Sequence, residues 1–176
     1  MDKIQNMNEY AERHALSLKD KEAYWNEIAK DYKWMKPHST VQSGDFNSLD
    51  IKWFDGAKLN ITENALDRHL ATRGDKTAVI WEPNDPKEAA KTFTYKELHA
   101  EVCKFANVLK DKGVKKGDRV VFYMSMVPEM LTGVLACARI GAVHSVVFGG
   151  FSAAALAGRI QDCGATMVVT NDEAYR

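Results

Sequence analysis

The stretch VHSVVFGGFS, residues 143–152, joins an apolar, β-branched run to two glycines and a serine. The run at 143–148 predicts a buried strand, because it is apolar and bounded by turn residues. Gly149 and Gly150 predict a tight turn, and Ser152 is a residue type that commonly caps a helix. The apolar positions expected to face inward on the following helix are Leu156, Ile160 and Cys163. The stretch therefore predicts one strand–turn–helix unit.

The same pattern extends on both sides of this unit. Residues 118–124 predict a strand, Pro128 suits the first turn of a helix, and Gly141-Ala142 ends that helix. The inward stripe expected on this helix is Leu131, Val134, Leu135 and Ala138. Gly164-Ala165 ends the next helix, and residues 166–170 predict a third strand on an open edge. Apolar strands that alternate with helices predict an α/β fold with a mostly parallel sheet, flanking helices on both faces and right-handed crossovers.

The segment before this repeat predicts two further helices and two strands. One helix is expected over residues 62–73, and extended structure is expected at 77–81 and 91–94. Thr94 and Glu97 have capping-box spacing, which predicts the start of a long helix. The buried positions expected in these helices are Leu66 and Leu70 in the first, and Leu98, Val102, Phe105, Ala106 and Leu109 in the second.

Residues 1–60 are richer in aromatic and polar side chains and predict a separate extension. Helices are expected over residues 8–17 and 21–31, the second capped by Asp20. Residues 35–59 are expected to be irregular apart from a strand at 51–54. Because its own apolar content is small, this segment is expected to wrap another body. We therefore divide the chain into an extension, residues 1–60, and the first part of an α/β domain, residues 61–176.

Composition argues against several classes of protein. The chain of 176 residues carries 24 basic and 24 acidic side chains, so its zero formal net charge favours neither a nucleic acid nor an anionic membrane as partner. Residues 130–158 contain Arg139 as their only formal charge and are long enough to span a bilayer. Five glycines and a changing periodicity in that span predict short helices and strands instead. The N-terminus does not resemble a signal peptide.

The cysteines, Cys103, Cys137 and Cys163, are odd in number and lack zinc-site spacing. All lie on the apolar side of an expected helix, which predicts buried free thiols in a reducing cytoplasm.

The turn at Gly149-Gly150 follows a predicted parallel strand, and open α/β sheets bind ligands at that end of their strands. The glycines permit positive φ and close backbone approach, and the following helix start offers N–H groups to an anion. The pattern matches neither GxGxxG nor GxxxxGK[ST], so a purely structural turn stays the alternative. Arg176 follows the third strand, where it suits a phosphate unless it is simply solvated.

Other polar residues are expected to be structural. His144 is expected to be a core histidine, and Asp67-Arg68-His69 is expected to be the surface of a helix. The histidines lack metal-site spacing, so we expect no metal ligand. Ser125 and Ser145 lack the GxSxG context of a nucleophile elbow, and we expect no catalytic residue in this chain.

Residues 136–152, ACARIGAVHSVVFGGFS, followed by AGRI at 157–160, closely resemble the AMP-forming acetyl-CoA synthetases of the adenylate-forming superfamily. The likeness extends from about residue 20 to the last residue. The supporting segments, in the order of that family, are Tyr24-Trp25, Ile51-Lys52-Trp53-Phe54, Leu59-Asn60, Leu66-Asp67-Arg68-His69-Leu70, Tyr95-Lys96-Glu97-Leu98, Lys116-Gly117-Asp118 and Tyr123-Met124-Ser125-Met126-Val127-Pro128-Glu129. Propionyl-CoA synthetases have similar signatures; the AGRI run and Val102-Cys103 look more like the acetate enzyme.

The resemblance implies a cytoplasmic ligase that makes acetyl-CoA, AMP and pyrophosphate from acetate, ATP and coenzyme A through acetyl-adenylate. The fold it implies is the start of the large N-terminal, AMP-binding domain, incomplete at the C-terminus. It also implies that Gly149, Gly150 and Arg176 lie at the coenzyme A site, with the arginine near the nucleotide phosphates.

The family's phosphate loop, which ends in Pro-Lys-Gly, is absent, since the only Pro-Lys here is Pro86-Lys87 followed by Glu88. Its adenylate-binding residues, acyl pocket and catalytic lysine are also missing, so ATP and Mg²⁺ are expected only in a full-length enzyme. We expect an N-terminal fragment of an acetate–CoA ligase that is inactive by itself. The alternatives are a propionate–CoA ligase fragment, a non-catalytic coenzyme A-binding or assembly module that joins a separately encoded remainder, and a non-functional remnant.

Overall fold

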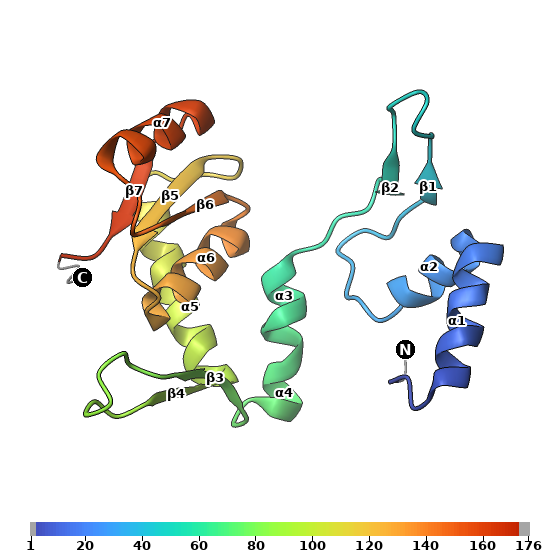
Figure 1. Ribbon diagram of the computed structural model, residues 1–176, viewed down its shortest axis with the longest axis horizontal. Coiled ribbons are helices and arrows are strands. Elements are labelled where there is room, and N and C mark those ends of the chain that lie inside the picture. The colour runs from blue at the N-terminus through green and yellow to red at the C-terminus, as the bar shows by residue number, and fades with distance from the viewer. Residues whose placement is uncertain (1–2, 173–176) are drawn as a thin grey trace. The chain divides into compact units, whose positions relative to one another are not determined.

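The computed structural model describes residues 3–172 (Figure 1). The chain divides into two compact units, Met1–Asn60 and Ile61–Arg176. We call them the N-terminal unit and the C-terminal unit and describe each by itself.

The N-terminal unit consists of two helices and a two-stranded antiparallel sheet (Figure 1). Helices α1 (Met7–Lys19) and α2 (Lys21–Ala29) confirm the two predicted helices. The carboxylate of Asp20 accepts a hydrogen bond from the Ala23 N–H at 2.9 Å, which is the predicted cap. Strand β2 (Lys52–Asp55) confirms the strand expected near residues 51–54, but its partner β1 (Thr40–Ser43) lies in a region that was expected to be irregular.

Aromatic contacts hold much of the N-terminal unit together. The rings of Trp25 and Trp53 meet edge to face at 6.0 Å, and those of Trp34 and Phe54 lie 5.5 Å apart. Its buried apolar side chains, among the residues that the structure describes, are Ala29 and Val41. This unit therefore has a small apolar core.

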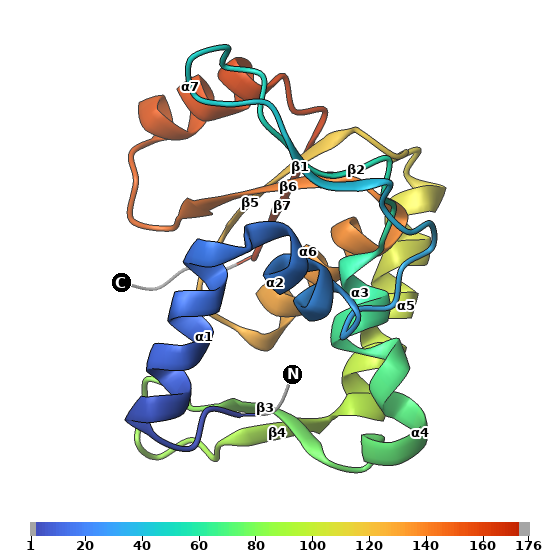
Figure 2. The ribbon, with the colours of Figure 1, turned by 90° about the vertical axis from the view of Figure 1, so that its right-hand side faces the viewer.

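The C-terminal unit is built on a parallel sheet in the order β6-β5-β7. Its strands are β5 (Arg119–Met124), β6 (Val143–Phe148) and β7 (Met167–Thr170). Helices α5 (Tyr95–Asp111) and α6 (Pro128–Ile140) lie on one face of the sheet and α7 (Ala153–Cys163) on the other (Figure 2). Val120, Val121 and Phe122 on the central strand are 0% exposed, since both faces are covered. The predicted α/β class with a parallel sheet is confirmed.

A second, antiparallel sheet precedes the parallel one. Strands β3 (Thr77–Trp81) and β4 (Lys91–Thr94) coincide with the predicted strands. At the start of α5, the Thr94 hydroxyl accepts from the Glu97 N–H, and the Glu97 carboxylate accepts from the Thr94 N–H, so the predicted capping box is confirmed. The helix buries Leu98, Val102, Ala106 and Leu109 as expected, while Phe105 is partly buried.

Two predictions about helices were wrong in whole or in part. The helix expected over residues 62–73 is divided into α3 (Ile61–Ala65), a 3-10 turn η1 (Asp67–His69) and α4 (Leu70–Arg73). The chain bends at Leu66, which is buried. On α6 the predicted stripe is only partly right: Val134 and Leu135 pack partly buried against the core, but Leu131 is 38% exposed, and the buried positions are Met130, Gly133, Ala136 and Cys137. Three of the four buried positions are small residues, which a search for large apolar side chains does not select.

Strand β6 lies at an edge of the three-stranded sheet, and this changes the environment of His144. The predicted core histidine is exposed, as is Val143 beside it. The inward positions predicted on α7 are only half-buried. Within residues 3–172, no helix is both long and apolar enough to cross a membrane.

Candidate functional site

The turn at residues 149–152 joins β6 to α7 and lies at the carboxyl ends of the parallel strands. The Phe151 N–H donates to the Phe148 carbonyl at 3.0 Å, which closes the turn. The Ser152 hydroxyl accepts from the Ala155 N–H at 3.3 Å, so the predicted N-cap of α7 is confirmed. The turn therefore carries the chain directly from a strand end into a helix start.

Tyr123 on the central strand fixes this turn. Its hydroxyl lies 3.1 Å from the Gly149 carbonyl oxygen and 2.9 Å from that of Phe151. Tyr123 was not among the predicted site residues. The register of the parallel strands could have identified Tyr123 as a neighbour of the turn, because it pairs with Val147, just before the turn begins.

The glycines of the turn do not have the backbone conformation that we expected. Neither Gly149 nor Gly150 has φ in the left-handed region, so positive φ does not explain them. The glycine at position 150 is better explained by a lack of space for a side chain, because a Cβ there would lie 2.6 Å from Cε1 of Phe148. At Gly149 a Cβ would make ordinary contact with the Met124 carbonyl oxygen, at 3.5 Å.

An open cavity of about 750 Å³ lies beside the turn, at the carboxyl ends of the three parallel strands. Its lining includes Met124, Met126, Met130, Val147, Phe148, Gly149 and Gly150. The polar side chains in the lining include Ser125 and Asn171, and the Asn171 amide donates to the Ser125 hydroxyl at 3.3 Å. A mostly apolar cavity of this size with a few polar groups is typical of a small-molecule site.

The predicted cation of this site, Arg176, lies outside the described residues. The described lining contains no lysine or arginine. Arg159 on α7 is near the turn, with its guanidinium 4.9 Å from the centre of the Phe151 ring. Across residues 3–172, no three histidine, cysteine or carboxylate side chains are grouped so that they could hold a metal ion.

Two family models match consecutive parts of the chain. Residues 66–176 match the model of the AMP-binding enzyme family. The chain belongs to the AMP-binding enzyme family. Residues 10–65 match the model described as the acetyl-coenzyme A synthetase N-terminus.

Several relatives of this AMP-binding protein carry the name acetyl-coenzyme A synthetase. Those of Methylobacterium radiotolerans and Vibrio cholerae are each 53% identical to it over 169 residues, which is 95% of this chain. That of Serratia proteamaculans is 53% identical over 173 residues, or 97% of the chain. The matched part is 26% of the length of each relative. The predicted resemblance to acetyl-CoA synthetases is confirmed.

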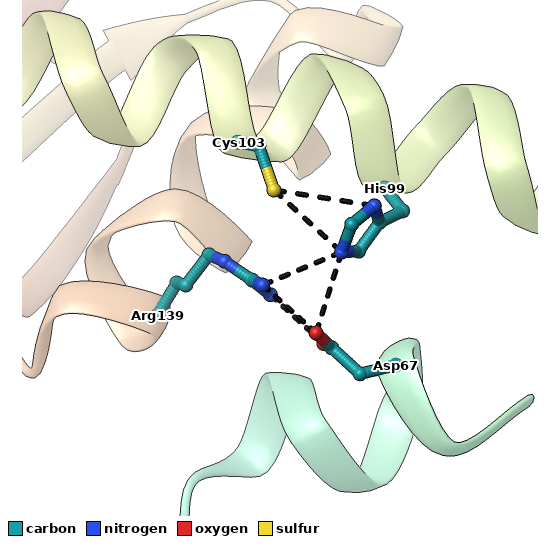
Figure 3. A network of polar contacts seen from close by, with 4 residues as sticks. All are labelled: Asp67, His99, Cys103 and Arg139. Atoms are coloured by element: carbon teal, nitrogen blue, oxygen red, sulfur yellow. Dashed lines mark hydrogen bonds and ion pairs between the residues drawn. The ribbon is translucent and has the colours of Figure 1, made fainter. Parts of the chain in front are cut away.

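A polar cluster in the AMP-binding part of the chain joins side chains of η1, α5 and α6 (Figure 3). Arg139 on α6 donates to both carboxylate oxygens of Asp67 at 2.8 Å, and His99 Nε2 lies 3.3 Å from Asp67 Oδ1. Hydrogen bonding from Arg139 lowers the pKa of the Asp67 carboxyl, and the same contact raises the pKa of Arg139. Asp67 therefore takes part in a half-buried ion pair, and its prediction as a helix surface residue was wrong.

Proposed function

We propose that this chain is the N-terminal portion of an acetate–CoA ligase. The observation that carries the proposal is 53% identity, over 95% of the chain, to proteins named acetyl-coenzyme A synthetase. In such a reaction acetate attacks the α-phosphate of Mg-ATP, which forms acetyl-adenylate and releases pyrophosphate. The coenzyme A thiol then attacks the acetyl carbonyl, and AMP leaves.

The proposal also divides the chain into two parts. Residues 61–176 are the first part of the AMP-binding domain, and residues 1–60 are an extension. The two matched segments, 10–65 and 66–176, support a boundary in this region. Three free thiols support a reducing compartment, and we propose the cytoplasm.

Within this chain we propose a partial coenzyme A site at Gly149, Gly150 and Arg176. Several features of the turn support it. The chain passes from a strand end into the N-terminus of α7, where backbone N–H groups and the helix dipole favour an anionic group such as a phosphate. Gly150 lets the turn pass close to the Phe148 ring, and the Tyr123 hydroxyl holds the turn in place. The apolar cavity beside the turn suits a long, mostly uncharged arm.

Calorimetric titration of the chain with coenzyme A tests this site. Gly150→Ala should weaken binding about tenfold, or about 1.4 kcal/mol, because the added methyl group crowds the turn. Phe148 is 70% exposed and can rotate away from that methyl, so the variant should stay folded. Gly158→Ala on α7 is the matched control, since nothing lies within 4 Å of a Cβ there, and it should bind like the unmodified chain.

Two outcomes of the titration would contradict parts of the proposed site. If Arg176→Ala binds coenzyme A as tightly as the unmodified chain, Arg176 is not a ligand. If the unmodified chain shows no binding at millimolar coenzyme A, the partial site is wrong, while the membership in the family stands.

We further propose that the 176-residue chain does not turn over alone. Adenylation requires a cradle for the ATP phosphates, a bound Mg²⁺ and neutralising cations. This sequence lacks the Pro-Lys-Gly phosphate loop, and Pro86-Lys87 lies in a charged segment beside Glu88. Mixing the chain with acetate, Mg-ATP and coenzyme A should release no pyrophosphate above background. Release above background would contradict this proposal.

A further inference from the structure

The indole of Trp81 links the antiparallel sheet to the loop that leads into α6. Trp81 is the last residue of β3 and is half-buried. Its Nε1–H donates to the Met126 carbonyl oxygen at 2.9 Å, between residues 45 positions apart in sequence. Because an indole nitrogen only donates and a carbonyl oxygen only accepts, the direction of this hydrogen bond is unambiguous. A hairpin outside the parallel sheet therefore holds a loop at the carboxyl end of β5.

The contacted loop, residues 125–127, forms part of the wall of the open cavity. Ser125 and Met126 both line that cavity. Val127 is the N-cap residue of α6, but its side chain makes no hydrogen bond to the helix start. An N-cap side chain commonly fixes the point where a chain enters a helix. Because this one does not, the position of the loop depends on contacts from other parts of the chain.

Contacts from two other strands hold the loop. Trp81 binds its middle residue from the end of β3, and the Asn171 amide, just after β7, donates to the Ser125 hydroxyl at 3.3 Å. Met126 is 78% exposed, so its own side chain adds little packing. Lys91 is the cross-strand partner of Trp81, and its ammonium lies 5.2 Å from the centre of an indole ring that it helps to orient.

We propose that Trp81 is a positioning residue for the ligand cavity, which acts through the Met126 carbonyl to hold the loop as one wall. The proposal rests on the coenzyme A site proposed above, whose uncharged arm the cavity suits. A wall that is held in place before the ligand arrives loses less conformational entropy on binding, so the ligand binds more tightly. Trp81 is not among the described residues that line the cavity, so it acts on the ligand only through the loop.

The test removes the N–H donor and keeps an aromatic ring, by Trp81→Phe in the full 176-residue chain. Calorimetric titration with coenzyme A should show binding about fivefold weaker, as the loss of one hydrogen bond predicts. Hydrogen exchange, followed by NMR without coenzyme A, should be about fivefold faster at the Val127 amide. That amide donates to the Ser125 carbonyl at 2.9 Å, and this bond should open more often when the loop is no longer held.

Two control variants separate positioning from a general loss of stability. Val79 lies on the same strand and packs partly buried against the core, so Val79→Ala should lower Tm. It leaves the indole hydrogen bond in place, so coenzyme A affinity and Val127 exchange should stay as in the unmodified chain. Lys91→Gln removes the cation beside the ring but keeps the indole donor, and it should change the affinity by less than about twofold. A merely structural role for Trp81 predicts instead that Val79→Ala and Trp81→Phe act alike.

A folded Trp81→Phe variant with unchanged coenzyme A affinity would overturn the proposal, and so would unchanged exchange at Val127. If that variant does not fold, the unmodified chain decides: bound coenzyme A should slow exchange of the Trp81 indole N–H, and an unchanged rate would overturn the proposal.

Failure of the coenzyme A site itself gives a different result. If the unmodified chain does not bind coenzyme A, the proposed site is wrong, and Val127 exchange alone tests Trp81. Faster exchange in Trp81→Phe would then support the indole as the group that holds the cavity wall, and unchanged exchange would contradict it.

Discussion

Gly133 on α6 shows how much one missing side chain matters in this molecule. A Cβ at this position would lie 2.3 Å from Cε1 and 2.9 Å from Cζ of Phe122. Phe122 is on the central strand and is 0% exposed, and because protein interiors are close-packed its ring has little room to move. The close approach of α6 to the sheet therefore depends on a glycine.

We expect Gly133→Ala to destabilise the chain by about 1–3 kcal/mol, because it overpacks a filled core. This loss outweighs the gain of about 1 kcal/mol that alanine brings to a helix interior. Urea denaturation measures the free energy of unfolding of each variant.

Gly158→Ala is the control for helix propensity. It also lies within a helix, but nothing lies within 4 Å of its added methyl group. It should therefore stabilise the chain by about 0.5–1 kcal/mol. A Gly133→Ala variant as stable as Gly158→Ala would show that the Phe122 ring moves aside at little cost.

The same residues explain why the inward stripe of α6 was predicted only in part. Hydrophobic periodicity weights large side chains, and it selected Leu131 as part of the inward stripe. The residues that allow the closest contact, Gly133, Ala136 and Cys137, are small and carry little weight in such a pattern. Their burial depends on the shape of the opposing sheet, which is not encoded in the helix itself.

At the scale of elements, the ion pair between Asp67 and Arg139 joins η1 to α6, and His99 adds α5 to the contact. Three separate helical segments therefore meet at one carboxylate. Asp67 and Arg139 are 72 residues apart in sequence, so no local pattern identifies them as partners.

Asp67→Asn should destabilise the chain by about 1 kcal/mol near neutral pH, a value between those of exposed and buried ion pairs. The pKa of the Asp67 carboxyl lies below its ordinary value of 3.8, chiefly because Arg139 donates hydrogen bonds to the ionised form. The stabilisation is therefore fully present above that ordinary value and is lost as pH falls through the lower folded-state pKa. The difference in Tm between Asp67→Asn and the unmodified chain should shrink as the solution is acidified past that point.

The exposed pair of Lys96 and Asp75 gives a matched comparison. These groups lie 2.9 Å apart, but their side chains are 59% and 90% exposed. Asp75→Asn should change stability by less than about 0.5 kcal/mol at any pH. If Asp67→Asn behaves in the same way, the half-buried pair does not hold the three segments together.

At the scale of the whole molecule, the order and type of most elements could be predicted from local pattern. The strands of the parallel sheet, the capping box at Thr94 and the cap at Ser152 each depend on residues within one short window. Contacts between distant windows could not be predicted in this way. Tyr123 reaches the turn 26 and 28 residues further along the chain, and the bend at Leu66 interrupts a sequence that is locally suited to a helix.

Burial differs sharply between the two units and predicts how each would behave alone. The continuous apolar core of the chain lies within the C-terminal unit, where Val102, Val120 and Phe122 are 0% exposed. In the described part of the N-terminal unit, Ala29 and Val41 are the buried apolar side chains. A segment of this size with so little apolar burial cannot offset the conformational entropy that it loses on folding.

We therefore expect residues 61–176, produced alone, to unfold cooperatively with heat or urea, and residues 1–60, produced alone, to show no cooperative transition. Circular dichroism measures both, and dilute samples are needed because Val143, Val146 and Phe148 on the edge strand β6 are exposed. The aromatic contacts of the N-terminal unit, such as Trp25 with Trp53, provide a second signal in near-ultraviolet spectra. A cooperative transition in the 1–60 piece would contradict the argument, because it would mean that ring contacts stabilise this unit without a larger apolar core.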